Sequence, residues 1–212
     1  MTAIRPHSSD ELLTAYAAGT LPQPFALVLA AHVSLCLDCR AAFEAHQAAG
    51  GAVLDTLDTA DLSGGLKART MALLDAPAPP AEPVHARSGA YPGPVMAALK
   101  GRPPRWKSLG MGIRQCILSA GSEGSARLLY IPPGRAVPDH SHNGLELTLV
   151  LQGSFSDETG RFGVGDLEVA DQDLEHTPVA DPGPPCICLA ATDAPLRFSS
   201  LVPRLLQPLF RI

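Results

Sequence analysis

The sequence predicts a two-domain protein of the α plus all-β class, in which a small metal-stapled helical bundle precedes an antiparallel β-sandwich or barrel. The first observation is a histidine and cysteine cluster near the N-terminus, within a segment of helical periodicity. The second is a Pro-rich stretch followed by short β-rich runs. The third is a separate group of histidines and a glutamate among those runs, which indicates a second metal site.

Composition limits the class of protein. The chain has 212 residues, 46% hydrophobic and 17% charged, which is typical of a globular protein. The net charge of −5 comes without a basic patch, so direct nucleic-acid binding is not expected. The N-terminus lacks an apolar signal-peptide core, and no apolar run approaches the roughly 20 residues of a membrane span. Five cysteines, in spacings that suit metal better than disulfides, favour the reducing cytoplasm.

Residues 1–76 are expected to form a helical domain. Ser8 and Glu11 are spaced as a capping box, and Gly19 is a natural stop for the helix that follows. Pro22 or Pro24 can open a second helix. That helix is apolar nearly all round from Phe25 to Val33, so both of its faces should be covered.

Two further helices are expected in this domain. Asp38 is the expected cap of a third helix, which runs to Gly50 and Gly51. Ser63 is the expected cap of a fourth, over residues 64–75, with four side chains facing inward: Leu66, Thr70, Leu73 and Leu74.

Residues 77–104 are predicted to be a Pro-rich linker with one short helix at its end, because its proline density is incompatible with a long helix or a central strand. Residues 105–212 contain short runs rich in β-branched and apolar residues, separated by Gly, Pro, Asp and Asn. That spacing predicts an antiparallel sandwich or barrel.

The N-terminal ligand group has the spacing of a structural zinc site. His32 precedes Cys36 by four residues and Cys39 follows by three, so one continuous helix or a break near Cys36 can bring them together. His7 is the expected fourth ligand, and Asp38 or water are the alternatives. The alternative is that the same residues are buried thiols and an ordinary core histidine, without a metal.

The C-terminal ligand group follows the parity of a strand. His140, His142 and Glu146 have the same parity, so their side chains can share a face, and His176 can join them from another strand. Three imidazoles and a carboxylate leave coordination positions open on a divalent metal. The alternative is a pair of surface histidines beside a turn.

At these residues the chain resembles the cupin family. The pattern Gly134-x5-His140-x-His142-x3-Glu146-x6-Gly153 fits the first cupin motif at every position. The second motif is matched at Gly165 and His176, whereas Asp171, Asp173 and Ala180 stand where the family has Pro, Gly and Asn. The resemblance implies a double-stranded jelly-roll barrel.

The pattern His-x3-Cys-x2-Cys resembles the zinc-binding anti-sigma domain, and that domain followed by a cupin is the layout of the ChrR family of anti-sigma factors. The strings from Leu13 to Thr20, from Gly144 to Gly153 and from Cys188 to Phe198 also resemble ChrR proteins. The resemblance implies an anti-sigma factor that holds an extracytoplasmic-function sigma factor inactive in the cytoplasm and releases it under singlet oxygen or organic hydroperoxides. It also implies a sensing role for the cupin and Zn²⁺ at both sites; Mn, Fe or Ni are alternatives for the cupin.

Two alternative functions remain on sequence grounds. One is a metal-dependent cupin dioxygenase or isomerase with a zinc-stapled accessory domain. The other is a thiol-switched anti-sigma factor whose cupin is passive. Cys186 and Cys188 are expected on one face of a strand, either as buried thiols or as a redox pair near the metal.

Overall fold

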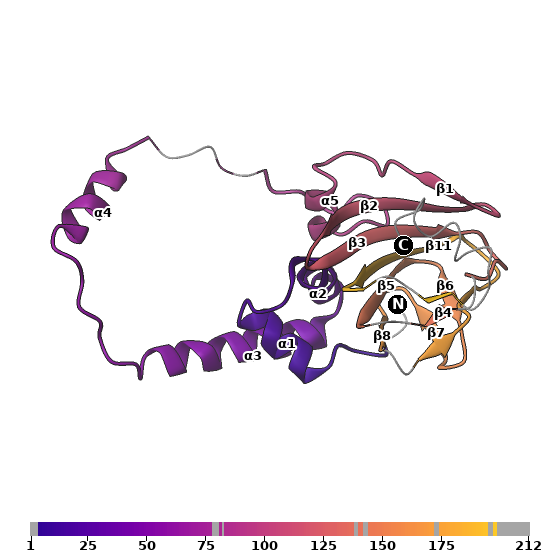
Figure 1. Cartoon of the computed structure of the whole chain (residues 1–212), viewed down its shortest axis with the longest axis horizontal. Helices are drawn as coiled ribbons and strands as arrows, with labels where there is room; N and C mark the ends of the chain where they lie inside the picture. The colour runs from indigo at the N-terminus through magenta and orange to yellow at the C-terminus, as the bar shows by residue number, and fades with distance from the viewer. Residues whose placement is uncertain are drawn as a thin grey trace.

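The computed structural model describes residues 4–77, 81, 83–137, 144–171 and 174–194, together with the backbone of 140–141 and 197–198. Its helices lie in the first half of the chain and its strands in the second (Figure 1). The helices are α1 (Asp10–Ala17), α2 (Gln23–Leu35), α3 (Leu37–Leu54), α4 (Leu66–Leu74) and α5 (Gly93–Ala98).

Three antiparallel sheets form the second half. The largest has the order β1-β2-β3-β11-β5-β8, and the smaller ones have the orders β10-β6-β7 and β12-β4-β9. The strands are β1 (Lys107–Gly110), β2 (Ile113–Gly121), β3 (Gly124–Ile131), β4 (His140–Ser141), β5 (Glu146–Gln152), β6 (Ser154–Ser156), β7 (Arg161–Gly163), β8 (Leu167–Ala170), β9 (Glu175–His176), β10 (Val179–Ala180), β11 (Cys186–Thr192) and β12 (Arg197–Phe198). This architecture confirms the predicted helical region and antiparallel β-sandwich.

Helix α2 joins the two halves because it packs against both the large sheet and other helices. It packs on β3, β5 and β11 and also contacts α3 and α5. Val28 and Leu29 are fully buried and share one apolar cluster with Leu147 and Leu149 of β5. The other face of β5 carries Glu146, Thr148 and Val150 into the sandwich interior, so both faces of this strand are buried, as its alternation predicts.

Two helix starts differ from the sequence prediction. Helix α1 is capped by Ser9 rather than Ser8, and the Ser9 hydroxyl accepts a hydrogen bond from the Leu12 amide at 3.3 Å. Helix α3 begins after Cys36, and Asp38 lies in its first turn. Glycine at 50 and 51 does not end α3, because an exposed helix tolerates glycine at a cost of only about 1 kcal/mol each.

Helix α4 contradicts the prediction of an inward apolar face. It begins after Gly65, without a side-chain cap from Ser63, and none of its residues is buried. Leu73 and Leu74 are each 73% exposed. Figure 1 shows α4 well apart from the body of the molecule, beyond the projecting end of α3. Periodicity alone was therefore misleading, since an apolar stripe does not specify what covers it.

The predicted division at residues 76 and 105 stays a prediction. The linker contains α5, as expected, and this short helix packs against α2. Within the described part of the chain, no single helix is long and apolar enough to cross a membrane. Helices α2 and α3 meet the length and composition requirement only as a pair bent by 117°.

Candidate metal sites

The N-terminal cluster is built at the junction between α2 and α3. Residue 36 has extended backbone angles, φ −100° and ψ 113°, which end one helix and begin the next. The last turn of α2 supplies His32, the junction supplies Cys36 and the first turn of α3 supplies Cys39. All three side chains are buried. Of the two predicted arrangements, the structure has the broken helix.

His7 completes this group from the segment before α1. Its Nδ1 lies 3.3 Å from the Cys36 Sγ and 3.6 Å from the Cys39 Sγ. One ligand atom from each of His7, His32, Cys36 and Cys39 lies within 4.8 Å of the others. Asp38 is further out, with its carboxylate 3.9 Å from the His7 Nε2.

The ring of His32 fits a metal ligand. Its Nδ1 donates a hydrogen bond of 3.0 Å to the Gly165 carbonyl, whereas its buried Nε2 has no hydrogen-bond partner in the described structure. Burial lowers the pKa of His32 to about 4, against the opposing effect of the Gly165 bond, so the ring is neutral. A neutral imidazole with one nitrogen oriented by a carbonyl is the usual state of a metal-bound histidine.

The thiols also fit a cation. Burial, together with the neighbouring Cys36, raises the pKa of Cys39 to about 11, against the opposing hydrogen bond from the Ser8 amide. Two thiolates are therefore unfavourable here without a compensating positive charge, which a divalent metal provides. The structure thus contains a possible His/Cys metal-binding cluster near the N-terminus.

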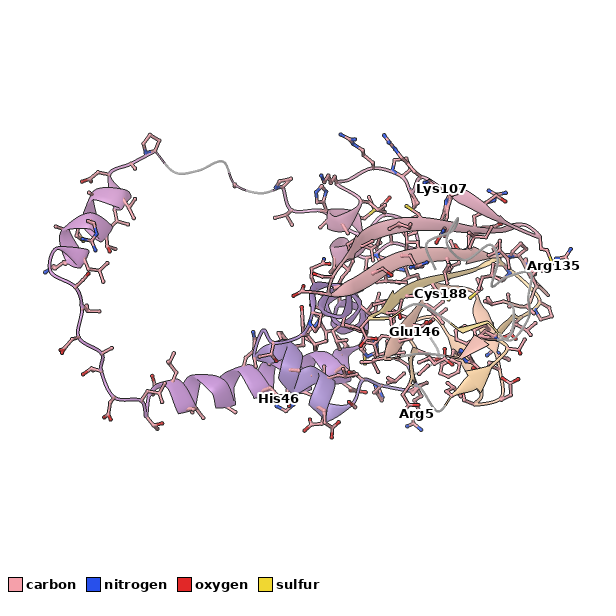
Figure 2. The ribbon with its side chains drawn as sticks, in the orientation of Figure 1. Arg5, His46, Lys107, Arg135, Glu146 and Cys188 are labelled. Atoms are coloured by element: carbon pink, nitrogen blue, oxygen red, sulfur yellow. The ribbon has the colours of Figure 1, made fainter. Side chains whose placement is uncertain are left out.

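The described members of the second predicted ligand group lie in the β-sandwich. His140 of β4 and His176 of β9 are directly paired in register, which brings their backbones side by side. Glu146 begins β5; its side chain is buried and accepts a 2.9 Å hydrogen bond from Thr148 (labelled Glu146 in Figure 2). His142 and the side chain of His140 lie outside the described part of the structure. The shared metal site of these four residues stays a prediction.

Two acidic residues that the sequence reasoning missed surround His176. The His176 Nδ1 lies 2.7 Å from the Asp157 Oδ2 and 3.3 Å from the Glu168 Oε1. The three form a compact buried group whose ligand atoms lie within 4.8 Å of one another. Asp157 follows β6 in a sequence that resembles an ordinary turn. The one signal for Glu168 was its place in a strand between apolar residues.

These three groups change one another's pKa values. Burial opposes charge on Asp157, but hydrogen bonds from Glu168, Thr159 and His176 outweigh it and lower its pKa to about 2. Burial raises the pKa of Glu168 to about 7, despite His176. Burial also disfavours the His176 cation, yet the two carboxyl groups raise its pKa to about 9. Without a metal, an imidazolium beside an aspartate is therefore the favoured state near neutral pH.

A buried arginine also faces this interior. The Arg127 guanidinium donates to Gln115 at 3.2 Å and to Ser125 at 2.7 Å. Burial lowers its pKa, which nearby Glu146 opposes. The sandwich interior is therefore polar around the predicted metal ligands and apolar elsewhere, with a second apolar cluster that includes Phe155 and Phe162.

Cys186 and Cys188 share a face of β11, as their spacing predicts. Their sulfurs are 3.5 Å apart and both side chains are buried (Cys188 is labelled in Figure 2). The hydrogen bond with Cys186 and burial raise the pKa of the Cys188 thiol well above its usual value. Cys188 is therefore held as a thiol, in which form cysteine is a poor nucleophile.

The chain is similar to known proteins over its whole length. A family model described as the ChrR Cupin-like domain matches residues 97–194. The Anti-sigma-E factor ChrR of Cereibacter sphaeroides is 57% identical over 211 residues, covering 99% of each chain. The crystal structure of Rhodobacter sphaeroides SigE in complex with the anti-sigma ChrR matches with a TM-score of 0.80 and 54% identity, over 90% of this chain and 100% of that one.

A solved RmlC-like cupin protein from Ralstonia eutropha JMP134 matches with a TM-score of 0.42 and 19% identity, over 45% of this chain and 66% of that one. Family membership follows from the full-length relative. Identity of 57% across 99% of both chains extends through the helical half and the β-sandwich alike. The resemblance seen in the sequence is confirmed, and the chain belongs to the ChrR family of anti-sigma factors, which are regulators and not enzymes.

Proposed function

We propose that this chain is a cytoplasmic anti-sigma factor that sequesters an extracytoplasmic-function sigma factor and releases it under oxidative stress such as singlet oxygen. The observation that carries the proposal is the full-length similarity to ChrR, a protein crystallised in complex with SigE. The alternative of a cupin dioxygenase or isomerase is set aside, because this relative is a regulator over the same length of chain.

Exposed apolar side chains support a protein partner. They gather on the end of α3, the segment after it and α4, and they are Val53, Leu54, Leu57, Leu62, Met71, Leu73 and Leu74. Apolar surface of this kind, spread over consecutive elements, marks protein–protein contacts. Figure 1 shows that these elements project from the body, where a partner can reach them. They are the surface that a sigma factor would cover.

Zn²⁺ is the metal we assign to the N-terminal group, because a set of two thiolates and two imidazoles is typical of closed structural zinc sites. The ligands would be His7, His32, Cys36 and Cys39. There the metal would fix the angle between α2 and α3 and hold the segment before α1 against both. Since α3 leads to the exposed apolar surface, this site would determine how that surface is presented.

The cupin site would hold Zn²⁺ or another divalent ion such as Mn, Fe or Ni, through His140, His142, Glu146 and His176. With positions open to small molecules, this metal would supply the chemistry that detects the oxidant. The sandwich that contains it packs on α2, so a change in it can reach the helical half. A switch of this kind requires different affinities for the sigma factor in the two states.

Sensing in the cupin is favoured over a thiol switch at the N-terminal site. A disulfide between Cys36 and Cys39 would close a very short loop and would constrain little beyond it. A redox role for Cys186 and Cys188 stays a prediction.

Sigma binding is tested with the full zinc-loaded chain and an extracytoplasmic-function sigma factor from the same organism. We expect tight binding that blocks transcription, and at least a tenfold weaker complex with Leu73→Ser/Leu74→Ser. The control is Val84→Ser, which changes a side chain that is 98% exposed in the linker and should bind normally. Absence of binding by the unmodified chain would contradict the proposal.

The sensing role is tested on the preformed complex under illumination with a singlet-oxygen photosensitiser. We expect release of sigma from the unmodified chain and retention by His176→Ala, which lacks one cupin ligand. The thiol-switch alternative gives the opposite result, since His176→Ala would then release sigma normally. Metal content before illumination checks that the variant has lost only the cupin ion.

A further inference from the structure

Two elements of the β-sandwich hold the ring of His176 on its Nδ1 side. One is the turn that follows β6, which carries Asp157, and the other is β8, which carries Glu168. They approach the ring from separate positions in the sequence. Both acidic side chains are buried, at 0% and 4% exposed. Burial of two carboxyl groups is costly, so their pairing with one imidazole requires an explanation.

Asp157 is held firmly enough to orient the ring. Its Oδ1 accepts hydrogen bonds from the Thr159 amide at 2.8 Å, the Thr159 hydroxyl at 2.7 Å and the Gly160 amide at 3.1 Å. Its Oδ2 remains for the His176 Nδ1 at 2.7 Å. One oxygen therefore fixes the turn, and the other fixes the histidine to that turn.

Glu158, which follows Asp157, connects the same turn to Thr177, the residue after His176. The Glu158 carboxylate accepts a 3.0 Å hydrogen bond from the Thr177 amide. The turn thus contacts both the side chain of His176 and the backbone that follows it. These contacts fix the direction of the ring as well as its place.

Glu168 reaches the ring from the interior face of β8. It is directly opposite Thr148 in the β5–β8 register, and Thr148 donates to Glu146. Glu146 and Glu168 therefore project from paired strands into the same interior. The Glu168 Oε1 lies 3.3 Å from the His176 Nδ1 and has no hydrogen-bond partner in the described structure, so its contact with the ring is electrostatic.

We propose that Asp157 and Glu168 are positioning residues for the cupin metal, holding the His176 ring through Nδ1 so that Nε2 is directed to the ion. This inference rests on the proposed metal-binding function of the cupin, and extends it to residues outside the ligand set. A carboxylate that accepts from Nδ1 fixes the tautomer and raises the basicity of the other nitrogen. Asp157 is the principal partner by distance, and Glu168 supports it.

The first measurement is the zinc affinity of the full chain, by competition with a chelator. We expect Asp157→Ala to weaken the cupin zinc by about 10–100-fold and to leave the N-terminal zinc unchanged. The cupin zinc affinity of Asp157→Asn should lie between those of the unmodified chain and Asp157→Ala, because an amide oxygen still accepts a hydrogen bond from Nδ1 but carries no charge. Glu168→Gln should have a smaller effect. His176→Ala identifies which of the two zinc ions belongs to the cupin.

The second measurement reads the ring itself. Long-range ¹H–¹⁵N spectra of the zinc-loaded chain should show His176 with a proton on Nδ1 and the metal on Nε2. In Asp157→Ala this assignment should be lost or mixed. Metal on Nδ1, with the proton on Nε2, would overturn the proposal and would make Asp157 and Glu168 ligands themselves.

Asp181→Asn is the matched control for a merely structural effect. Asp181 is a partly buried carboxylate that holds β6 through hydrogen bonds from Ser154 and Ser156, and its partners in the described structure do not include His176. The substitution Asp181→Asn should lower the free energy of unfolding and leave the cupin zinc affinity unchanged. Equal loss of affinity in Asp181→Asn and Asp157→Ala would overturn the proposal. If His176→Ala removes no metal, the cupin site itself fails, a result distinct from a failure of positioning alone.

Discussion

At the scale of single residues, Asp181 shows how one carboxylate organises a small sheet. It accepts from the hydroxyl groups of Ser154 and Ser156 on β6 and forms a 2.8 Å ion pair with Arg161 on β7. Burial opposes its charge, but these partners outweigh burial and lower its pKa. The group is therefore more stable as a carboxylate in the folded protein than in the unfolded chain.

The consequence is a pH-dependent contribution to stability. Because the folded pKa is lower than the unfolded value of about 4, the contribution is complete above that value and is lost as pH falls through the folded pKa. We expect Asp181→Asn to cost about 1–3 kcal/mol at pH 7. Urea unfolding of both proteins should show this difference shrinking below about pH 4. A difference that is constant with pH would contradict the role of the charge.

The thiols of Cys186 and Cys188 give a second prediction at this scale. Both are buried, and the pKa of Cys188 is raised by its partner and by burial. We expect both to resist alkylation in the folded protein and to react only on unfolding, as mass spectrometry of cysteine peptides can measure. Rapid modification of either thiol under native conditions would favour the redox pair over the core interpretation.

At the scale of elements, α2 and α4 are both rich in leucine and have opposite environments. Leu29 of α2 is fully buried against the large sheet, whereas Leu73 of α4 is 73% exposed. Both helices carry the same residue type, so the same substitution can compare them. The difference follows from what each helix packs against and not from helix propensity.

We expect Leu29→Ala to lower the free energy of unfolding by about 2–5 kcal/mol, because it leaves a cavity between α2 and the sheet. Leu73→Ala should change it by less than about 0.5 kcal/mol. Urea unfolding of the two variants tests the pair. Comparable losses would mean that α4 packs against the body in solution.

At the scale of the whole molecule, the N-terminal metal group is attached to the β-sandwich. Besides the bond from His32 to the Gly165 carbonyl, the Arg5 amide donates to Asp166 at 2.6 Å and the Leu167 amide donates to the Pro6 carbonyl at 3.2 Å. The chain around the start of β8 therefore contacts both His32 of the candidate metal cluster and the segment that leads to His7. Glu168 is the next residue along β8.

Gly165 is suited to this close contact and a side chain is not. Its φ is +93°, and an added Cβ would lie 2.6 Å from the Ile4 side chain. We expect Gly165→Ala to displace the N-terminal segment and to speed zinc loss from the His7 and His32 group by at least several-fold. A chelator-based release assay measures the rate. Gly183→Ala is the control, because Gly183 also has a positive φ but has open space around it. Equal rates of zinc release from the two variants would mean that backbone strain alone, and not the contact with Ile4, causes the loss.

The sequence by itself determined the fold class, the family and the N-terminal ligand spacing. Strand parity and turn residues are local properties, so the alternation of β5 and the pairing of Cys186 with Cys188 could be predicted. The spacing of His32, Cys36 and Cys39 is likewise local, because a helix end fixes the distance between them. The sequence predicted Ser8 as the cap of α1, whereas the structure has Ser9. The two serines have equal capping ability, so only packing selects between them.

Only the tertiary structure decided which residues meet from distant parts of the chain. Asp157, Glu168 and His176 come from three separate strands or turns. The sequence pattern of any one of these segments does not predict its contact with the other two. The bond from His32 to Gly165 joins residues 133 positions apart. The exposure of α4 was equally hidden, because the same leucine stripe is compatible with a core or with a partner. Long-range packing decides such contacts, and periodicity reports only on neighbours along the chain.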